Sequence, residues 1–201
     1  MECLFVHKTQ PLRDALAPKE RVWRKRTEGL QLTKGSKNLA GGKRLDLLAA
    51  ISHNKGVLLI QEYEKMTGAY FARFVQDKFP ALSSRKRGRK WFVMDNDPSQ
   101  RSLATRKAIK KESCELFSIP AKSPDLNPIE NLFHLVKKQL EFQVRDAHII
   151  RETWQEFKSR VIKTLYNVPV EYVNNIITSM PRRTDVVAKA DGYRTKYYRG
   201  C

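Results

Sequence analysis

The chain has 201 residues, 41% of them apolar, so it can bury one sizeable core and favours one domain with appendages over several domains. Its formal net charge of +18 favours a polyanionic partner, because cations near phosphates release condensed counterions. No apolar run reaches about 18 residues, so we expect no membrane span, and the three scattered cysteines encode neither a disulfide framework nor a zinc site.

The first sixty residues predict short strands. We expect an opening strand at residues 2–6, a second one at 21–23 and a basic loop over 24–42. An apolar strand at 45–52 is followed by the turn sequence HNKG and a further run at 57–63, which predicts a hairpin.

The middle of the chain alternates helices with strands. A helix is expected over 67–78, with Thr67 as its cap, and a strand at 114–119. The short strand at 91–94 is uniformly apolar, which indicates cover on both faces. A helix over 100–111 carries a basic outer face, made of Arg101, Arg106, Lys107, Lys110 and Lys111.

A basic stretch, SSRKRGRK at residues 83–90, precedes the apolar strand. Its cations are Arg85, Lys86, Arg87, Arg89 and Lys90. A solvated loop, contact with a DNA backbone and nuclear import are interpretations that stay open.

Helices dominate the last third. A helix from Glu130 has one apolar stripe at period 3.6, and two more are expected at 147–166 and 169–180, before a basic tail. We therefore expect a main domain over residues 1–180 and a tail over 181–201. Strands interleaved with helices, after an early hairpin, predict a mixed α/β layer structure.

The stretch over residues 91–132 places two carboxylates at element ends. The strand WFVM ends in Asp95 of DNDP, and SPDLNPIEN starts a helix at Glu130, with 34 residues between the two acids. Such positions are fixed by the packing behind them and open to solvent in front, which suits a rigid cation site that admits a substrate.

These motifs resemble the catalytic domain of Tc/mariner-type DNA transposases, whose DDE site combines two aspartates and a glutamate. The resemblance extends to RVWRKRTEGL near residue 21 and to SMPRRTDVVAKADGYRTKY near the C-terminus. It implies a ribonuclease-H-like fold, DNA as the partner and the nucleus as the location. We expect no membrane partner, and a homodimer or a transposase oligomer is the assembly to test.

The resemblance also implies a two-metal site for Mg²⁺ or Mn²⁺. Two such ions activate an attacking water or hydroxyl and stabilise the leaving oxygen in phosphodiester chemistry. Carboxylates are the ligands that magnesium takes in proteins. Asp95 would hold a metal shared with the third ligand, and Glu130 would hold the second metal.

Each acidic residue also has a purely structural explanation. Glu130 stands three residues after Asn127, as in a capping box, and Asp95 lies in strong turn chemistry. Asp97 and Asp125 are interpreted as residues that shape loops. His134 lies one helical turn after Glu130, where a contact with metal or phosphate and a partly buried structural role both stay open.

Three departures from the family stand out. Met1 occupies the place of the first aspartate in the family's D-E-S-x-F, and Glu2 is a poor substitute because neighbouring strand side chains point to opposite faces. Asp46 lies on another strand, and nothing in the sequence places it near Asp95. Gln100 stands where the family often carries histidine, and the sequence shows none of the family's amino-terminal helix-turn-helix domains.

Two hypotheses follow. The first is a transposase catalytic domain, a strand-cleaving and strand-joining enzyme by descent, impaired by the missing aspartate and cut short at its start. The second is a non-catalytic basic DNA-binding protein left by a decayed or co-opted transposon. An unrelated basic α/β nucleic-acid protein is a weaker third.

Overall fold

The computed structural model describes residues 2–8, 12–13, 44–82, 90–95, 97–120, 123–149, 152–190, 195 and 197. Its central strands are β1 (Glu2–Lys8), β4 (Leu47–Ser52), β5 (Gly56–Glu62), β6 (Lys90–Met94) and β7 (Cys114–Ser118). They form a five-stranded mixed sheet in the order β5-β4-β1-β6-β7. Strands β1, β6 and β7 run parallel, whereas β4 is antiparallel to β1 and β5.

A second, two-stranded sheet pairs β2 (Leu12–Arg13) with β3 (Arg44–Leu45). The strands expected at 2–6, 45–52, 57–63, 91–94 and 114–119 are confirmed as β1, β4, β5, β6 and β7. The strand expected at 21–23 and the basic loop at 24–42 lie outside the described residues.

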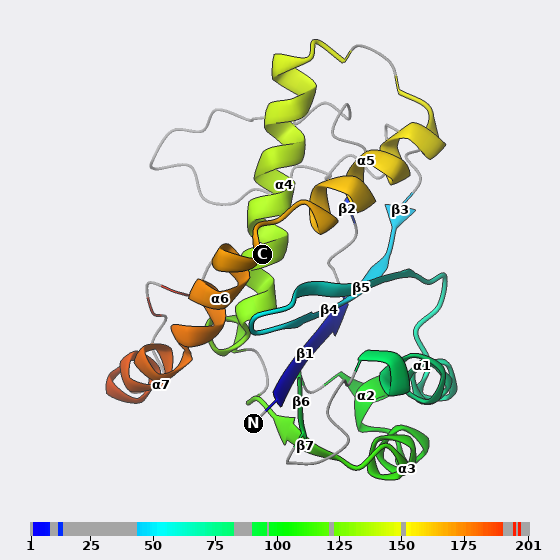
Figure 1. Ribbon diagram of the computed structural model, residues 1–201, viewed down its shortest axis with the longest axis vertical. Helices are drawn as coiled ribbons and strands as arrows, with labels where there is room; N and C mark the ends of the chain where they lie inside the picture. The colour runs from blue at the N-terminus through cyan, green and yellow to red at the C-terminus, as the bar shows by residue number, and fades with distance from the viewer. Residues whose placement is uncertain are drawn as a thin grey trace, which may run out of the picture.

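Helices cover both faces of this sheet (Figure 1). One face carries α1 (Gly68–Leu82), α2 (Pro98–Arg101) and α3 (Leu103–Lys111). The other carries the 3₁₀ turn η1 (Pro124–Leu126), α4 (Pro128–Asp146), α5 (Trp154–Tyr166) and α6 (Val170–Thr178), with α7 (Met180–Lys189) beside them. None of the helices in the described ranges is long and apolar enough to cross a membrane.

Strand β6 divides its side chains between two cores, as its uniformly apolar sequence predicts. Val93 packs in the core with α4, α5 and α6, whereas Phe92 and Met94 pack in the core with α1 and α3. Successive strand residues point to opposite faces, so a strand buried on both sides must be apolar throughout. The expected cover on both faces is therefore confirmed.

The tip of the β4–β5 hairpin needs left-handed backbone, with φ of 61° at Asn54 and 71° at Gly56. A Cβ on Gly56 would lie 3.1 Å from Val170 Cγ2, at the start of α6. The Asn54 N–H donates to Asn174 Oδ1 at 2.7 Å, and Asn174 Nδ2 donates back to Asn54 Oδ1 at 3.1 Å. The predicted hairpin is therefore confirmed, and its turn is fixed on α6.

Three expected helix bounds were wrong, and side-chain capping explains two of them. The helix predicted over 100–111 is broken at Ser102, whose ψ of 150° is not helical and whose hydroxyl accepts from the Thr105 N–H. The helix predicted from residue 147 begins at Trp154 instead, because Thr153 and Glu156 form a capping box. The third concerns the end of the chain, since the segment expected as a basic tail begins as helix α7.

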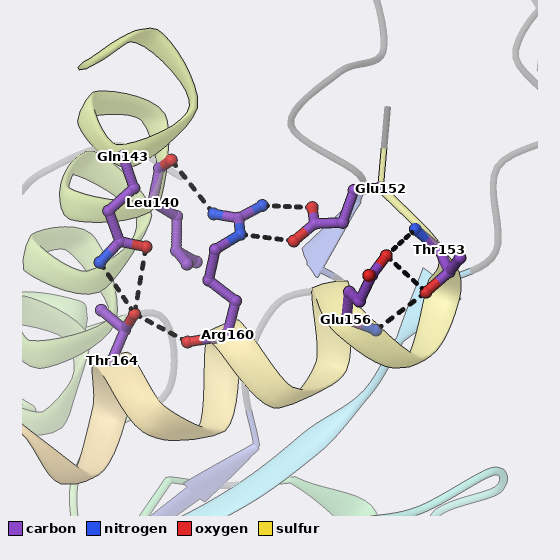
Figure 2. A network of polar contacts seen from close by, with 7 residues as sticks. All are labelled: Leu140, Gln143, Glu152, Thr153, Glu156, Arg160 and Thr164. Carbon is purple, nitrogen blue, oxygen red and sulfur yellow. Dashed lines mark hydrogen bonds and ion pairs between the residues drawn. The ribbon is translucent and has the colours of Figure 1, made fainter. Parts of the chain in front are cut away.

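An ion pair joins α4, α5 and the segment between them (Figure 2). Arg160 of α5 donates to both carboxylate oxygens of Glu152 at 2.6 Å and to the Leu140 carbonyl of α4 at 3.3 Å. Both side chains are largely buried, at 14% exposure for Arg160 and 5% for Glu152. One turn on, Thr164 exchanges hydrogen bonds with Gln143. The second half of α5 is therefore held against the distal half of α4, and Arg160 also holds the segment that precedes α5.

Candidate active site

Asp95 is the residue that follows β6, and it is half-buried. Its Oδ1 accepts the Asp97 N–H at 3.3 Å. Asp97 itself caps α2, since its Oδ1 accepts from the Ser99 N–H at 2.9 Å and from the Ser99 hydroxyl. Asp97 is thus a loop-shaping residue, as expected, and the cap orients the turn that carries Asp95.

Gln100 binds Asp95 from the first turn of α2. Its side chain is almost fully buried, at 1% exposure. With the amide nitrogen oriented toward Asp95, Gln100 donates to Asp95 Oδ1 at 2.7 Å and to the Asp95 carbonyl at 3.0 Å. The departure from the family at this position is therefore a direct neighbour of the carboxylate. The sequence feature that could have predicted this contact is the spacing of five residues between Asp95 and Gln100, across a turn that Asp97 caps.

The chain that leads to Glu130 leaves the sheet beside Asp95. Met94 and Ser118 are register partners at the ends of β6 and β7, and the Ile119 N–H donates to the Met94 carbonyl at 3.2 Å. From there the chain enters η1 and then α4, whose first turn carries half-buried Glu130. Asp95 thus follows β6 directly, and the segment that leads to Glu130 leaves β7 at the same edge of the sheet.

The first turn of α4 is rigid because its apolar residues are buried. Ile129 and Leu132 have no exposed surface and pack in the same core as Val93 of β6. The partial positive charge of a helix amino terminus also favours a carboxylate there. Glu130 is therefore held at the surface by the packing on either side of it.

The capping-box explanation of Glu130 was wrong. Asn127 makes no side-chain cap, and its N–H donates to the Pro124 carbonyl at 3.1 Å. By contrast, Glu156 accepts from the Thr153 N–H at 2.7 Å and completes a capping box on α5. Glu130 has no such role in starting its helix.

Asp125 of the SPDLNP motif is structural, as expected. Only 5% of it is exposed; its Oδ2 accepts from the Thr195 hydroxyl at 3.0 Å, and its carbonyl accepts from Arg183 Nη1 at 3.2 Å. Arg183 of α7 also lies 4.9 Å from the Tyr197 ring centre, and its burial lowers the pKa of its guanidinium. The C-terminal motif therefore anchors the turn that starts α4.

Asp46 lies beside Tyr63, whose N–H donates to the Asp46 carbonyl at 3.1 Å. It is buried just before β4, and its carboxylate pairs with Arg44 Nε at 2.8 Å. Burial, and then the charges of Asp46 and Asp97, raise the pKa of Tyr63 to about 12. Both acids therefore lie close to the same phenol, with Asp46 already paired to an arginine.

Glu2 lies at the other end of the sheet from Asp95. Its register partner is Lys90, five residues before Asp95, which corresponds to roughly 16 Å along a strand. Phe5 pairs with Val93, so the register brings His7 of β1 level with Asp95. Position along the strand therefore makes Glu2 a poor substitute ligand. The expectation that residue 1 takes the place of the first ligand was wrong, because the register puts position 7 level with Asp95. Met1 lies outside the described residues.

Asp95 and Glu130 offer the oxygen ligands that Mg²⁺ and Mn²⁺ prefer. In the parts of the chain that the structure describes, no three His, Cys, Asp or Glu side chains form a group that could hold a metal ion. The donor chemistry of Asp95 and of Glu130 thus fits a divalent cation.

The remaining candidates are His134 and the basic stretch at residues 83–90. His134, one turn along α4 from Glu130, is exposed. Arg85, Lys86, Arg87 and Arg89 lie outside the described residues, while the backbone of Lys90 begins β6.

Comparison with known proteins gives one consistent result. A family model described as DDE superfamily endonuclease matches residues 6–163. Over 107 residues the chain is 35% identical to the transposable element Tc1 transposase of Caenorhabditis elegans, and the match covers 53% of the chain and 37% of that protein. The chain thus matches little more than a third of that relative's length.

Solved structures agree with this family match. The Mos1 transposase catalytic domain with Raltegravir and Mg matches with a TM-score of 0.63 at 23% identity, over 78% of this chain and 80% of that one. A Mos1 paired-end complex with left transposon end matches with a TM-score of 0.73 at 18% identity, over 98% of this chain and 56% of that one. The predicted ribonuclease-H-like fold is confirmed by this likeness.

Proposed function

The chain belongs to the DDE superfamily endonucleases, as a Tc/mariner-type transposase catalytic domain, and from this premise we propose that it binds DNA and cleaves its phosphodiester bonds. The observation that carries the proposal is the placement of Asp95 and Glu130. Asp95 directly follows β6, Glu130 lies in the first turn of α4, and no helix cap accounts for Glu130.

In this proposal Asp95 and Glu130 hold divalent metal, and Gln100 keeps the Asp95 carboxylate in one orientation. Bound Mg²⁺ or Mn²⁺ would supply an activated water or hydroxyl and a stabilised leaving oxygen. Support comes from the carboxylate donors and from the Mg named with the Mos1 catalytic domain. We further propose that the rate is impaired, because the β1 position level with Asp95 is occupied by His7 and not by an aspartate.

The proposed substrate is DNA. A net charge of +18 favours a polyanion, and the paired-end Mos1 structure is a complex with a transposon end. We infer that the protein acts in the nucleus, a reducing compartment. We also infer that the protein assembles as a homodimer or a larger oligomer. A fluorescent fusion and light scattering of the purified chain test these two points.

The first experiment is nicking of supercoiled plasmid by the purified chain in Mg²⁺ or Mn²⁺. Asp95→Asn and Glu130→Gln should each abolish metal-dependent nicking. Glu171→Gln is a matched control, because Glu171 is also a first-turn acid, on α6, and is exposed. Equal loss in the control, or nicking that survives both site changes, would refute the assignment of these residues.

A second candidate function is a non-catalytic DNA-binding protein. It is favoured by His7, which is not a carboxylate, at the β1 position level with Asp95. This candidate predicts no nicking and DNA affinity that falls steeply with salt. A salt-independent affinity would count against DNA binding in both candidates.

A further inference from the structure

Helix α3 has one buried side and one strongly basic side. Thr105, Ala108 and Ile109 are buried, and the last two pack in the core with α1. The opposite side, with the end of α2, exposes five cations that we call the α3 basic face: Arg101, Arg106, Lys107, Lys110 and Lys111. At 3.6 residues per turn, the four cations of α3 fall within an arc of about 140°.

The α3 basic face is not neutralised by acids. The described ion pairs join other cations to carboxylates, such as Arg73 to Asp77 on α1 and Lys158 to Glu62. Among the described residues, no ion pair involves a member of the basic face. The nearest carboxylate in the sequence is Glu112, at the end of α3.

Helix stability does not account for this arrangement. The helix dipole favours Lys110 and Lys111 in the last turn, but not Arg106 and Lys107 near the start. Like charges four residues apart, as at 106 and 110 and at 107 and 111, destabilise a helix by about 0.2–0.5 kcal/mol per pair. A polyanion along the helix would remove this repulsion.

The α3 basic face is rigidly connected to the Asp95 loop. Asp97 caps α2, Ser102 caps α3, and the buried Thr105 hydroxyl donates to the Ser99 carbonyl at 2.8 Å. These bonds fix α3 to the short helix that begins three residues after Asp95. A backbone bound along α3 is therefore held at a fixed position relative to that carboxylate.

We propose that the α3 basic face binds the phosphate backbone of duplex DNA and holds it at a fixed position relative to Asp95. The identity of the substrate rests on the proposed function, whereas the surface rests on the charges and packing of α2 and α3. The nine residues of α3 extend about 14 Å, at 1.5 Å per residue. Measured along the duplex axis, that length matches about four successive phosphates of one strand, at 3.4 Å each.

The test compares two variants with the same net charge. The face variant carries Arg106→Gln, Lys107→Gln, Lys110→Gln and Lys111→Gln. The control carries four exposed changes on α4, α5 and α7: Lys138→Gln, Arg145→Gln, Lys163→Gln and Lys189→Gln. Binding of a labelled duplex DNA is measured from low to high salt, and circular dichroism verifies folding.

The slope of log affinity against log salt should flatten by about 3 to 4 in the face variant, at 0.9 per lost phosphate contact. The control should flatten it by less than about 1, because its charges lie elsewhere on the surface. Equal changes in both variants would show that only net charge matters and would overturn the proposal. Tighter binding of duplex RNA than of duplex DNA would overturn the choice of partner.

The results that would refute the proposed DNA-binding surface differ from the results that would refute the proposed function. A chain that nicks plasmid through Asp95 and Glu130, but whose face variant binds DNA normally, refutes only the surface. A chain that never nicks, but loses its salt-dependent DNA binding in the face variant, refutes only the catalytic proposal.

Discussion

Replacing Arg160 with methionine should strongly destabilise the chain. The guanidinium makes two 2.6 Å contacts with Glu152 and one 3.3 Å contact with the Leu140 carbonyl (Figure 2). The change would leave the Glu152 carboxylate, only 5% exposed, without its cation. Removing one member of a buried ion pair costs about 3–5 kcal/mol, so we expect a loss in the free energy of unfolding near that range.

Urea denaturation followed by tryptophan fluorescence measures this loss, since Trp154 lies 5.5 Å from the Phe157 ring, one turn before Arg160. The double change Glu152→Met with Arg160→Met should recover much of the stability, because no buried charge is then left unpaired. A cost below about 1 kcal/mol for the single change would refute the reasoning. Strict additivity of the two single changes would refute it as well.

Three further predictions concern single side chains. Gln100→Leu should weaken Mn²⁺ binding, measured by electron paramagnetic resonance, because Asp95 loses its 2.7 Å donor. Gln100→His should restore the Mn²⁺ affinity, and equal affinity in all three forms would contradict this role of Gln100. The folded-state pKa of Tyr63 is raised to about 12 from 10.0, so its stabilising contribution is complete below pH 10 and is lost as pH rises to 12. After a discount for partial exposure, we expect about 1–2 kcal/mol of unfolding free energy to disappear across that window in denaturant titrations, and Tyr63→Phe should remove the dependence. Gly56→Ala should lower the free energy of unfolding by about 1–3 kcal/mol in the same assay, since φ is 71° and the new methyl would lie 3.1 Å from Val170. An unchanged denaturation midpoint would contradict the turn geometry.

Local pattern was sufficient for the elements that frame the candidate site. The apolar run WFVM predicted a strand covered on both faces, and the period-3.6 stripe after Glu130 predicted the buried side of α4. Both signals come from neighbouring residues, whose side-chain directions are set by backbone geometry alone. Helix bounds that depend on capping were harder to predict from the sequence. The helix expected from residue 147 begins at Trp154, because Thr153 and Glu156 form hydrogen bonds that cap it there.

Contacts between distant segments were decided only by tertiary packing. Arg183 reads as part of a basic tail, yet it is buried against the Asp125 carbonyl, 58 residues away in sequence. Asp46 reads as an isolated strand residue, yet it shares the surroundings of Tyr63 with Asp97. Sequence spacing specifies which face of an element is apolar, but not which element it meets, because that choice depends on the whole core. The sequence thus determined the family, the strand of Asp95 and the helix of Glu130, while packing decided which side chains hold those two acids in place.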